Sequence, residues 1–346
     1  MDAQQIVIPK AGGPDVLDVR TNAVAAPGQG EIQVEVHAAG INFADILARQ
    51  GLYPDAPPLP AVVGYEVSGV VVAQGSGVEE DRVGSEVVGM TRFGGYSSVV
   101  NAPGAQLFEK PAALSHAEAA SIPVAYLTAW QMIVVQGGLR SGDTILIQNA
   151  GSGVGLAALD IARHVGARTI GTASAGKHEF LTARGLDHAV DYRSGDWTNE
   201  VRSLTGGHGV DLVIDPLGGE SFRQSLRVLR PTGRLGMYGV SAASNNRGLL
   251  GKTQLAKTAL RMPFFHPVGL MNDNRGVFGT NLGHMWSEVD RMRDWMAEVL
   301  AGVESGWARP HVDSTFPFSR VAEAHAHIEA RKSIGKVVLV PDAVAD

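Results

Sequence analysis

The middle of the chain alternates short apolar runs with amphipathic stretches of helical length. The apolar runs are TILIQNA (144–150), RTIGTAS (168–174), HAVDY (188–192), VDLVIDP (210–216) and RLGMYG (234–239), and GVFGTN (276–281) is a candidate sixth. Helices are expected over 154–166 and 177–185. Continuous apolar strands separated by helices are typical of a parallel sheet buried on both faces. The pattern therefore predicts a doubly wound, Rossmann-type α/β domain.

The first 120 residues follow a different pattern. Apolar runs at 32–41, 67–75 and 85–91 are separated by Gly, Pro and Asp turns, and few helices can be placed between them. We expect a compact, largely antiparallel β domain. The last 50 residues are mixed, and they predict helices over about 286–302 and 319–331, a strand near 312 and the strand KVVLVP (336–341).

The strand KVVLVP (336–341) needs a sheet partner and does not continue the central series. We expect it to pair with the N-terminal β domain, which is then discontinuous and consists of 1–124 and 285–346. The nucleotide-binding domain is expected over 125–284. A length of 346 residues suits two domains.

Composition narrows the class of protein. The net charge of −6 argues against a general nucleic-acid binder. The chain has no cysteine, which excludes disulfides, thiolate nucleophiles and Cys-based zinc sites. Neither a basic, apolar leader nor about 20 uninterrupted apolar residues is present. A cytoplasmic protein is expected.

The stretch NAGSGVGLAALDIA (149–162) departs from the strict G-x-G-x-x-G spelling, because Leu156 stands where the last glycine would be. A phosphate needs a tight turn, close backbone N–H groups and a helix N-terminus. Small residues between a strand and a helix supply all three, although a purely structural turn is the alternative. The expected pyrophosphate contacts are Ala150, Gly151, Ser152, Gly153, Val154 and Gly155.

The end of the second strand indicates which nucleotide binds. NAD-dependent proteins usually place Asp or Glu there for the ribose 2′-hydroxyl, but no acidic residue lies between Asp160 and Glu179. Instead Ser174 ends the run and Lys177 follows. A hydroxyl and an ammonium suit a 2′-phosphate, which favours NADPH. The alternative is that Lys177 is an ordinary solvated lysine.

The chain resembles the medium-chain dehydrogenase/reductase superfamily. The resemblance lies in the layout described above and in GINFADILARQGLYP (40–54), GYEVSGVV (64–71) and the 144–240 region. Within this superfamily the chain is similar to the zinc-independent quinone oxidoreductases, closest to the vesicle amine transport protein subgroup. That closer likeness lies in 171–181, 210–219, 274–284 and 311–341. The resemblance covers essentially the whole chain. It implies a GroES-like β domain plus a Rossmann domain, with the active site in the cleft between them.

The resemblance also implies a loss of catalytic zinc. Zinc alcohol dehydrogenases have Cys near position 42 and a His-Glu pair after Gly64, where this chain has Asn42 and Tyr65-Glu66. Zn²⁺ prefers thiolate, imidazole and carboxylate ligands. His325 and His327, two apart on a helix, are not expected to face one site. His164 and His178 are expected to cover helix ends.

The resemblance implies particular cofactor contacts. Lys177, Tyr192 and Arg331 would surround the 2′-phosphate, with Ser174 beside them, and Thr128 would contact the nicotinamide side. Gly239 and Phe278 complete the expected set. Ser152 stands where the family loop more often has glycine. Tyr192 has an alternative interpretation as a strand-end aromatic residue.

Without a metal, reduction of a quinone or a conjugated enone is favoured, because hydride transfer then produces an already delocalised anion. Candidate hydrogen-bond donors to that anion are Asn42, Tyr53 and Tyr65. Tyr53 lies in GLYP, which lines the pocket in the resembling family. The alternative is that Tyr65 fills the space of the missing zinc, and both interpretations stay open. The proton donor is not assigned, and solvent is one candidate.

Two later segments leave alternatives open. Phe264, Phe265, Leu270 and Met271 would form either an apolar substrate wall or a subunit interface. The preceding 247–261 contains four basic and no acidic residues, namely Arg247, Lys252, Lys257 and Arg261. That run is either a solvated helix face or a contact for anionic lipid. Alternative functions are therefore a lipid-binding protein that retains a nucleotide site and a pathway-specific enoyl reductase. The resemblance and the strand-like 276–281 run together predict a homodimer.

Overall fold

The computed structural model describes residues 1–241, 258 and 260–342, and these form two compact units. The first, here called the β unit, comprises Met1–Leu127, Gly283–Ser305 and Pro310–Asp346. The second, here called the parallel-sheet unit, comprises Thr128–Leu282 and Gly306–Arg309.

The parallel-sheet unit contains a six-stranded parallel sheet in the order β10-β9-β8-β11-β12-β13. All six predicted strands are confirmed. The strand order reverses between β8 and β11, and ligands of open α/β sheets bind at the carboxyl ends of strands flanking such a switch. The strands are β8 (Thr144–Ile147), β9 (Arg168–Ala173), β10 (His188–Asp191), β11 (Val210–Asp215), β12 (Leu229–Met237) and β13 (Gly276–Gly279).

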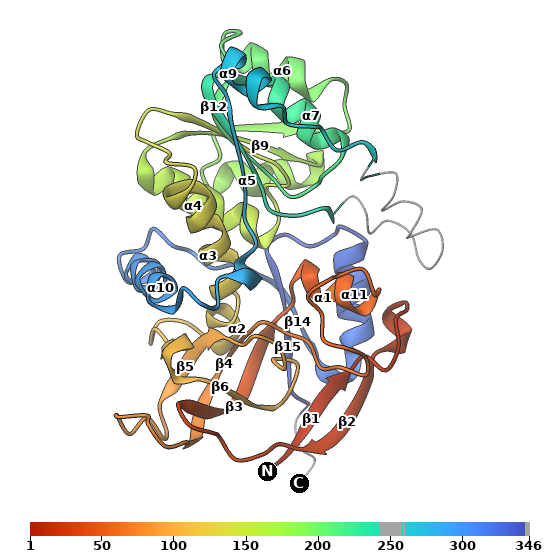
Figure 1. Ribbon diagram of the computed structural model, residues 1–346, viewed down its shortest axis with the longest axis vertical. Helices are drawn as coiled ribbons and strands as arrows, with labels where there is room; N and C mark the ends of the chain where they lie inside the picture. The colour runs from red at the N-terminus through yellow and green to blue at the C-terminus, as the bar shows by residue number, and fades with distance from the viewer. Residues whose placement is uncertain (242–257, 259, 343–346) are drawn as a thin grey trace. The chain divides into compact units, whose positions relative to one another are not determined.

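Helices pack against this sheet, with α4 on β8 and β9, α5 and α6 on β10, and α7 on β11 and β12 (Figure 1). The helix predicted over 154–166 is confirmed as α4, which ends where Gly166 adopts a φ of 86°. The chain enters this unit within α3 (Pro123–Trp130), whose residues from Thr128 on belong to it. Its other helical elements are η3 (Gln131–Val135), α4 (Gly153–Val165), η4 (Ala175–Lys177), α5 (His178–Ala183), α6 (Trp197–Leu204), α7 (Glu220–Arg227) and α9 (Pro267–Asp273).

The β unit contains a mainly antiparallel seven-stranded sheet, in which β14-β15-β3-β4-β5-β7 form one path and β6 also pairs with β3. A separate hairpin joins β1 and β2. The strands are β1 (Asp2–Val7), β2 (Asp18–Ala23), β3 (Glu31–Gly40), β4 (Glu66–Gln74), β5 (Glu86–Met90), β6 (Val99–Pro103), β7 (Leu107–Glu109), β14 (Val312–Pro317) and β15 (Lys336–Val340).

The expected return of the C-terminal strand is confirmed, because β15 pairs antiparallel with β3 through Val338 and Gly40. Segments far apart in the sequence thus share one sheet and one core. That core includes Ile32, Val67 and Leu339. The helical elements are η1 (Pro14–Val16), α1 (Phe43–Arg49), η2 (Gly104–Gln106), α2 (His116–Ala119), η6 (Leu282–His284), α10 (Val289–Glu304), η7 (Phe318–Arg320) and α11 (Val321–Glu329).

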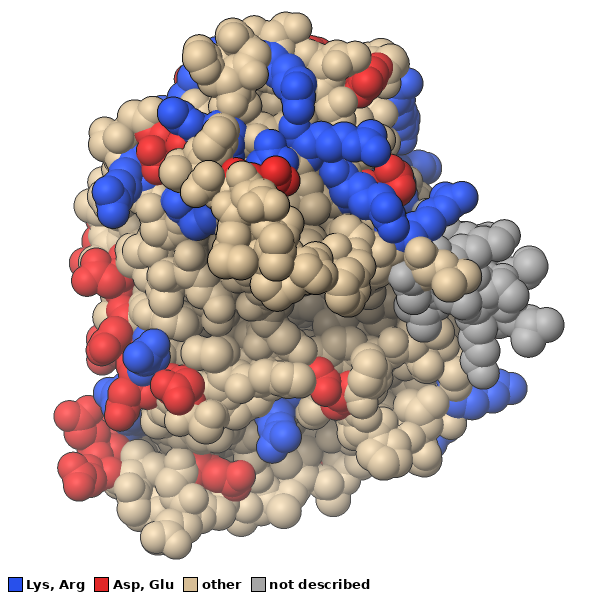
Figure 2. Space-filling model, turned by 45° about the horizontal axis from the view of Figure 1, so that its top comes forward, with Lys and Arg blue, Asp and Glu red and all other residues tan. Residues whose placement is uncertain are grey.

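Two surface properties bear on possible partners. In the described part of the chain, the helical run His116–Val135 is long and apolar enough to cross a membrane, but 72% of its most apolar window is buried, as in a core helix. Figure 2 shows Lys and Arg side chains gathered on the parallel-sheet unit despite the negative net charge. Of the basic run, Arg261 is exposed, whereas Arg247, Lys252 and Lys257 lie outside the described residues.

Candidate active site

The glycine-rich stretch forms the turn between β8 and α4. Ser152 is the N-cap of α4, and its hydroxyl accepts the N–H of Gly155 at 3.0 Å. The N–H groups of Gly153 and Val154 have no acceptor within the described residues. Unpaired N–H groups at the start of a 13-residue helix carry partial positive charge and bind anions.

Close packing explains the small residues of this turn. A Cβ on Gly155 would lie 2.5 Å from the carbonyl oxygen of Asn149, and one on Gly171 in β9 would lie 2.8 Å from the Cβ of Ala150. Asn149 itself adopts a φ of 56°. The turn therefore lies tightly against the sheet, although its sequence does not match the complete G-x-G-x-x-G motif.

Buried hydrogen bonds join the strand ends beneath the turn. Thr172 donates to Oε1 of Gln148 at 2.6 Å, which links β9 to the residue that follows β8. Ser221 and Ser225 donate to Oδ2 of Asp215 at 2.6 and 2.8 Å. Burial raises the pKa of the Asp215 carboxyl, although these hydroxyls oppose the shift. Asp215 was not among the predicted site residues, because a buried acid at a strand end looks the same in sequence as an exposed one.

Basic and hydroxyl groups follow β9 and β10. Cδ of Lys177 lies 3.0 Å, and Nζ 3.7 Å, from the position that a Cβ on Gly151 would take. The lysine is half-buried over the turn. Because Asp191 pairs with Ala173, Tyr192 and Ser174 are the next residues beyond the two strands at the same sheet edge.

Arg193 is a further basic residue at this edge, and it was not among the predicted cofactor contacts. Its guanidinium carbon lies 5.4 Å from the centroid of the Tyr192 ring, and Nε donates to the Tyr192 hydroxyl at 3.3 Å. The only sequence signal was its position directly after Tyr192. Together with Lys177 it gives the carboxyl ends of β9 and β10 two cations.

The remaining expected cofactor residues are spread over both units. Gly239 follows β12, and a Cβ there would lie 2.9 Å from the carbonyl oxygen of Pro216. The Phe278 ring packs over Gly236 in β12. Thr128 is buried in α3 at the start of the parallel-sheet unit. Arg331 belongs to the β unit, where it follows α11 with a φ of 57°.

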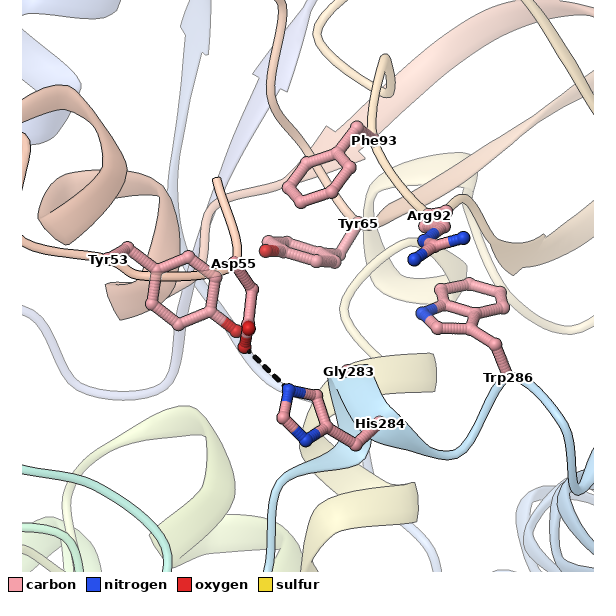
Figure 3. Close-up of a pocket in the computed structure, with 8 residues that line it drawn as sticks. All are labelled: Tyr53, Asp55, Tyr65, Arg92, Phe93, Gly283, His284 and Trp286. Atoms are coloured by element: carbon pink, nitrogen blue, oxygen red, sulfur yellow. Dashed lines mark hydrogen bonds and ion pairs between the residues drawn. The ribbon is translucent and has the colours of Figure 1, made fainter. Parts of the chain in front are cut away.

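A cavity of about 210 Å³ lies within the β unit (Figure 3). Tyr53 and Tyr65, two of the three candidate donors, face each other across it edge to face, with ring centroids 6.4 Å apart. The Phe93 ring packs on the Tyr65 ring, with their centroids 5.1 Å apart. The lining residues are Tyr53, Asp55, Tyr65, Arg92, Phe93, Gly283, His284 and Trp286.

Some polar groups of this cavity have hydrogen-bond or ion-pair partners and others do not. Nε2 of His284 lies 2.9 Å from Oδ2 of Asp55. The Tyr65 side chain is 6% exposed, and its hydroxyl makes no well-oriented hydrogen bond within the described residues. Burial, with smaller effects from Tyr53 and Asp45, raises the pKa of Tyr65, so this phenol stays protonated and able to donate. Burial likewise raises the pKa of Tyr53.

Asn42, the third candidate donor, is held in a different arrangement. Its amide nitrogen donates to Oε1 of Glu66 at 2.9 Å, and its amide oxygen accepts from Nζ of Lys336 at 2.8 Å. Lys336 also donates to the carbonyl oxygen of Ile41, and Oε2 of Glu66 accepts the N–H of Val124. Among the residues described, Asn42 is not part of the cavity lining. Its observed contacts orient the loop before α1.

The same cluster does not suit a zinc ion. Glu66 is already paired with an ammonium, and the neighbouring positions offer an amide and a phenol rather than thiolate or imidazole. No group of three or more His, Asp or Glu side chains in the described part of the chain is arranged to hold a metal. The two histidines of α11 face different partners, as predicted, because His325 is buried against Arg49 whereas His327 contacts Asp313 at 2.8 Å.

A buried polar chain extends behind Asn42. Oδ2 of Asp45 accepts from the Asn42 N–H at 2.8 Å and from the Tyr96 hydroxyl at 3.1 Å. The same hydroxyl lies 3.3 Å from Nε2 of His325, whose Nδ1 lies 3.1 Å from Arg49. Burial raises the pKa of Asp45 to about 7. Burial, helped by the charge of Arg49, lowers the pKa of His325 to about 3.

The apolar segment that was expected to form a substrate wall or a subunit interface is largely on the surface. Phe264 is 88% exposed and Met271 66% exposed. Phe265 packs against the core of the parallel-sheet unit, and Leu270 is half-buried. None of the four lines the cavity described above.

Two sequence families match the chain. Residues 28–112 match the alcohol dehydrogenase GroES-like domain, and residues 184–339 match a family described as zinc-binding dehydrogenase. The human synaptic vesicle membrane protein VAT-1 homolog is 37% identical over 346 residues, covering 97% of this chain and 86% of that protein.

Solved structures give the same grouping. Mycobacterial Rv1454c, solved in complex with NADPH, is 31% identical with a TM-score of 0.85 and covers 98% of this chain and 100% of its own. The CurK enoyl reductase is 27% identical with a TM-score of 0.85, covering 98% of this chain and 99% of its own. The predicted combination of a GroES-like domain with a Rossmann-type domain is confirmed.

Proposed function

Because the chain belongs to the medium-chain dehydrogenase/reductase superfamily, we propose that it is a zinc-independent, NADPH-dependent reductase of quinones or α,β-unsaturated carbonyl compounds. The observation that carries the proposal is the turn before α4. Gly153 and Val154 present N–H groups without an acceptor in the described structure, and the Lys177 side chain lies over Gly151.

The chain's residues suit each part of NADPH. The pyrophosphate would accept from the Gly153 and Val154 N–H groups. The 2′-phosphate would lie near Lys177 and Arg193, with Ser174, Tyr192 and Arg331 as further contacts. The absence of any acidic residue between Asp160 and Glu179 removes the usual repulsion of that phosphate. Bound NADPH would supply a hydride from C4 of the nicotinamide.

The cavity of the β unit is the proposed acceptor site. Tyr65 carries a buried hydroxyl without a partner in the described structure, and such a group is satisfied by an acceptor oxygen on a ligand. A quinone or enone oxygen that gains negative charge during hydride transfer fits this donor. Tyr53 is the second proposed donor, Asn42 stays a predicted one, and solvent returns the proton to carbon.

The test follows absorbance at the nicotinamide band with purified protein, NADPH or NADH, and a panel of quinones and conjugated enones. We expect turnover of at least one acceptor with NADPH at kcat/KM values roughly tenfold or more above NADH, about 1.4 kcal/mol of discrimination. NADPH binding without turnover of any panel member would leave a pathway-specific enoyl reductase. Absence of NADPH binding would overturn the proposal.

We also propose that the protein is a cytoplasmic homodimer. β13 is the edge strand of its sheet, and Leu260, Phe264 and Met271 are exposed on the same unit. An open strand edge and exposed apolar side chains are commonly covered by a second copy. Light scattering at micromolar concentration should give a mass twice that of the 36.4 kDa chain, and a monomer would contradict this.

A second candidate function is contact with anionic lipid, favoured by the exposed Leu260 and Phe264 beside Arg261. Apolar side chains flanked by basic ones bind anionic membrane surfaces. Lys252 and Lys257 precede this segment. Salt-sensitive binding to phosphatidylserine vesicles that is lost on changing both lysines to Glu would support the candidate, and absence of binding would remove it.

A further inference from the structure

The acceptor cavity contains a cation whose charge is not neutralised by a neighbouring acid. Arg92 lies two residues after β5 and is exposed to solvent, and no ion pair or hydrogen bond to its guanidinium is present in the described structure. The acid of the cavity, Asp55, is paired with His284 at 2.9 Å. Figure 3 shows Arg92 beside Trp286 on one side, and Asp55 with Tyr53 on the other.

This separation places an arginine without an acidic partner at one end of the cavity and a carboxylate paired with a histidine at the other. An anionic group on a ligand is attracted toward Arg92, whereas Asp55 is a hydrogen-bond acceptor that already has a partner, so one orientation is selected. The planar guanidinium binds a carboxylate through two parallel N–H groups, which adds direction to the attraction.

The Tyr65 hydroxyl supplies a second, independent constraint. The side chain is 94% buried, its hydroxyl has no well-oriented partner among the described residues, and Figure 3 shows it directed toward the side with Tyr53 and Asp55. A neutral carbonyl oxygen satisfies such a donor without adding charge near Asp55.

Size and lining limit the remainder of the ligand. About 210 Å³ is below the range of roughly 300–1,000 Å³ typical of sites for drug-sized ligands. Phe93 and Trp286 add flat apolar walls. A single planar ring or a short conjugated chain therefore suits the cavity better than a long isoprenoid tail.

We propose that this cavity recognises a small, planar, conjugated carbonyl compound that bears one carboxylate, with the carboxylate on Arg92 and the carbonyl oxygen on Tyr65. This substrate class rests on the reductase function proposed above. In the reaction, hydride adds to the alkene carbon β to the ketone, the C=C π bond breaks, and the resulting enolate takes a proton from water. NADPH is oxidised to NADP⁺.

A suitable probe pair is 3-benzoylacrylate and its neutral methyl ester, which differ only in the charged group that Arg92 would bind. Reduction of the acid yields 3-benzoylpropionate. The chain has no cysteine, so these electrophiles have no protein thiol to alkylate.

The turnover arm compares kcat/KM for the acid and the ester. We expect a ratio of about ten in the wild type, the order given by one partly screened charge-assisted contact. The ratio should fall toward one in Arg92→Gln, recover in part in Arg92→Lys, and decrease with added salt. Arg20→Gln, an exposed arginine of β2 paired with Asp18 outside the cavity, is the matched control and should keep the wild-type ratio.

The binding arm needs no turnover and measures 3-benzoylpropionate and its methyl ester by calorimetry. Preferential binding of the acid that is lost in Arg92→Gln supports the inference even if no acceptor is reduced, in which case only the reductase function fails. Turnover of both probes with a ratio near one, or a ratio unchanged in Arg92→Gln, overturns the inference and leaves the reductase function standing. If neither probe binds and neither is turned over, the inference is also overturned.

Discussion

Nζ of Lys336 lies 2.5 Å from Oε1 of Glu66, and both side chains are more than nine-tenths buried. Lys336 begins β15 and Glu66 begins β4, the two strands that flank β3. Because the ammonium also donates to Ile41 and Asn42, a lysine from near the end of the chain neutralises the one carboxylate that remains of the zinc-type motif. This arrangement fixes the loop that leads into α1.

Breaking that pair should destabilise the β unit strongly. Lys336→Met leaves Glu66 buried and uncompensated, and removing one partner of a buried pair costs about 3–5 kcal/mol. The double variant Glu66→Gln/Lys336→Met removes both charges and should recover part of the loss. Thermal unfolding measures both. Lys332→Met, at an exposed position nearby, is the control, and a Lys336→Met melting temperature equal to that of the control would contradict the assignment.

The Asp45–Tyr96–His325 chain should make two opposing contributions to stability against pH. The folded state holds a proton on Asp45 between its ordinary pKa of 3.8 and about 7, so this group makes stability fall as pH rises through that window. The folded state excludes a proton from His325 between about 3 and its ordinary 6.5, so this group makes stability rise with pH. Between pH 4 and 6.5 the two effects cancel in part.

Single substitutions should separate these contributions. Asp45→Asn keeps only the His325 effect. The unfolding free energy of this variant minus that of the wild type should therefore rise with pH, by up to about 1.4 kcal/mol per pH unit. His325→Gln keeps only the Asp45 effect, so the same difference for this variant should fall as pH rises. Urea unfolding at several pH values between 4 and 6.5 measures the slopes. Parallel profiles for the wild type and both variants would show that neither group titrates as described.

How far the sequence predicted the molecule depends on whether a feature is local. Apolar periodicity located all six strands of the parallel sheet, and the lone KVVLVP run predicted the pairing of β15 with β3. The small residues at 150–155 predicted a tight turn before a helix. The partner of Glu66, in contrast, is 270 positions away in sequence, and spacing gives no signal for it.

The cavity shows the same limit. Tyr53 and Tyr65 were expected from motifs near one another in sequence, whereas Arg92, His284 and Trp286 reach the same cavity from distant parts of the chain. The engagement of Asn42 with Lys336 was also not foreseen, because the sequence presents this residue as a free amide. Long-range pairing, rather than local propensity, decides these features.

Lys177 should carry much of the preference for NADPH. In Lys177→Glu a carboxylate would repel the 2′-phosphate and accept from a free ribose hydroxyl. We expect kcat/KM with NADPH to fall roughly 100-fold, about 2.7 kcal/mol, while the value with NADH stays equal or rises. Lys10→Glu, an exposed position in the β unit, is the control for net charge. An equal loss with both cofactors would point to a structural role for Lys177.

The close approach behind the phosphate turn should make Gly155 irreplaceable. A methyl group there would lie 2.5 Å from the Asn149 carbonyl oxygen and 2.6 Å from that of Ala150, both backbone atoms that move only with the turn itself. Gly155→Ala should therefore weaken NADPH binding by roughly tenfold or more, because the Gly153 and Val154 N–H groups would be displaced together. Gly269→Ala, in α9 with no atom within 4 Å of the added methyl group, is the matched control and should bind NADPH as the wild type does. Fluorescence titration of NADPH measures both dissociation constants, and equal affinities would show that the turn has room the structure does not provide.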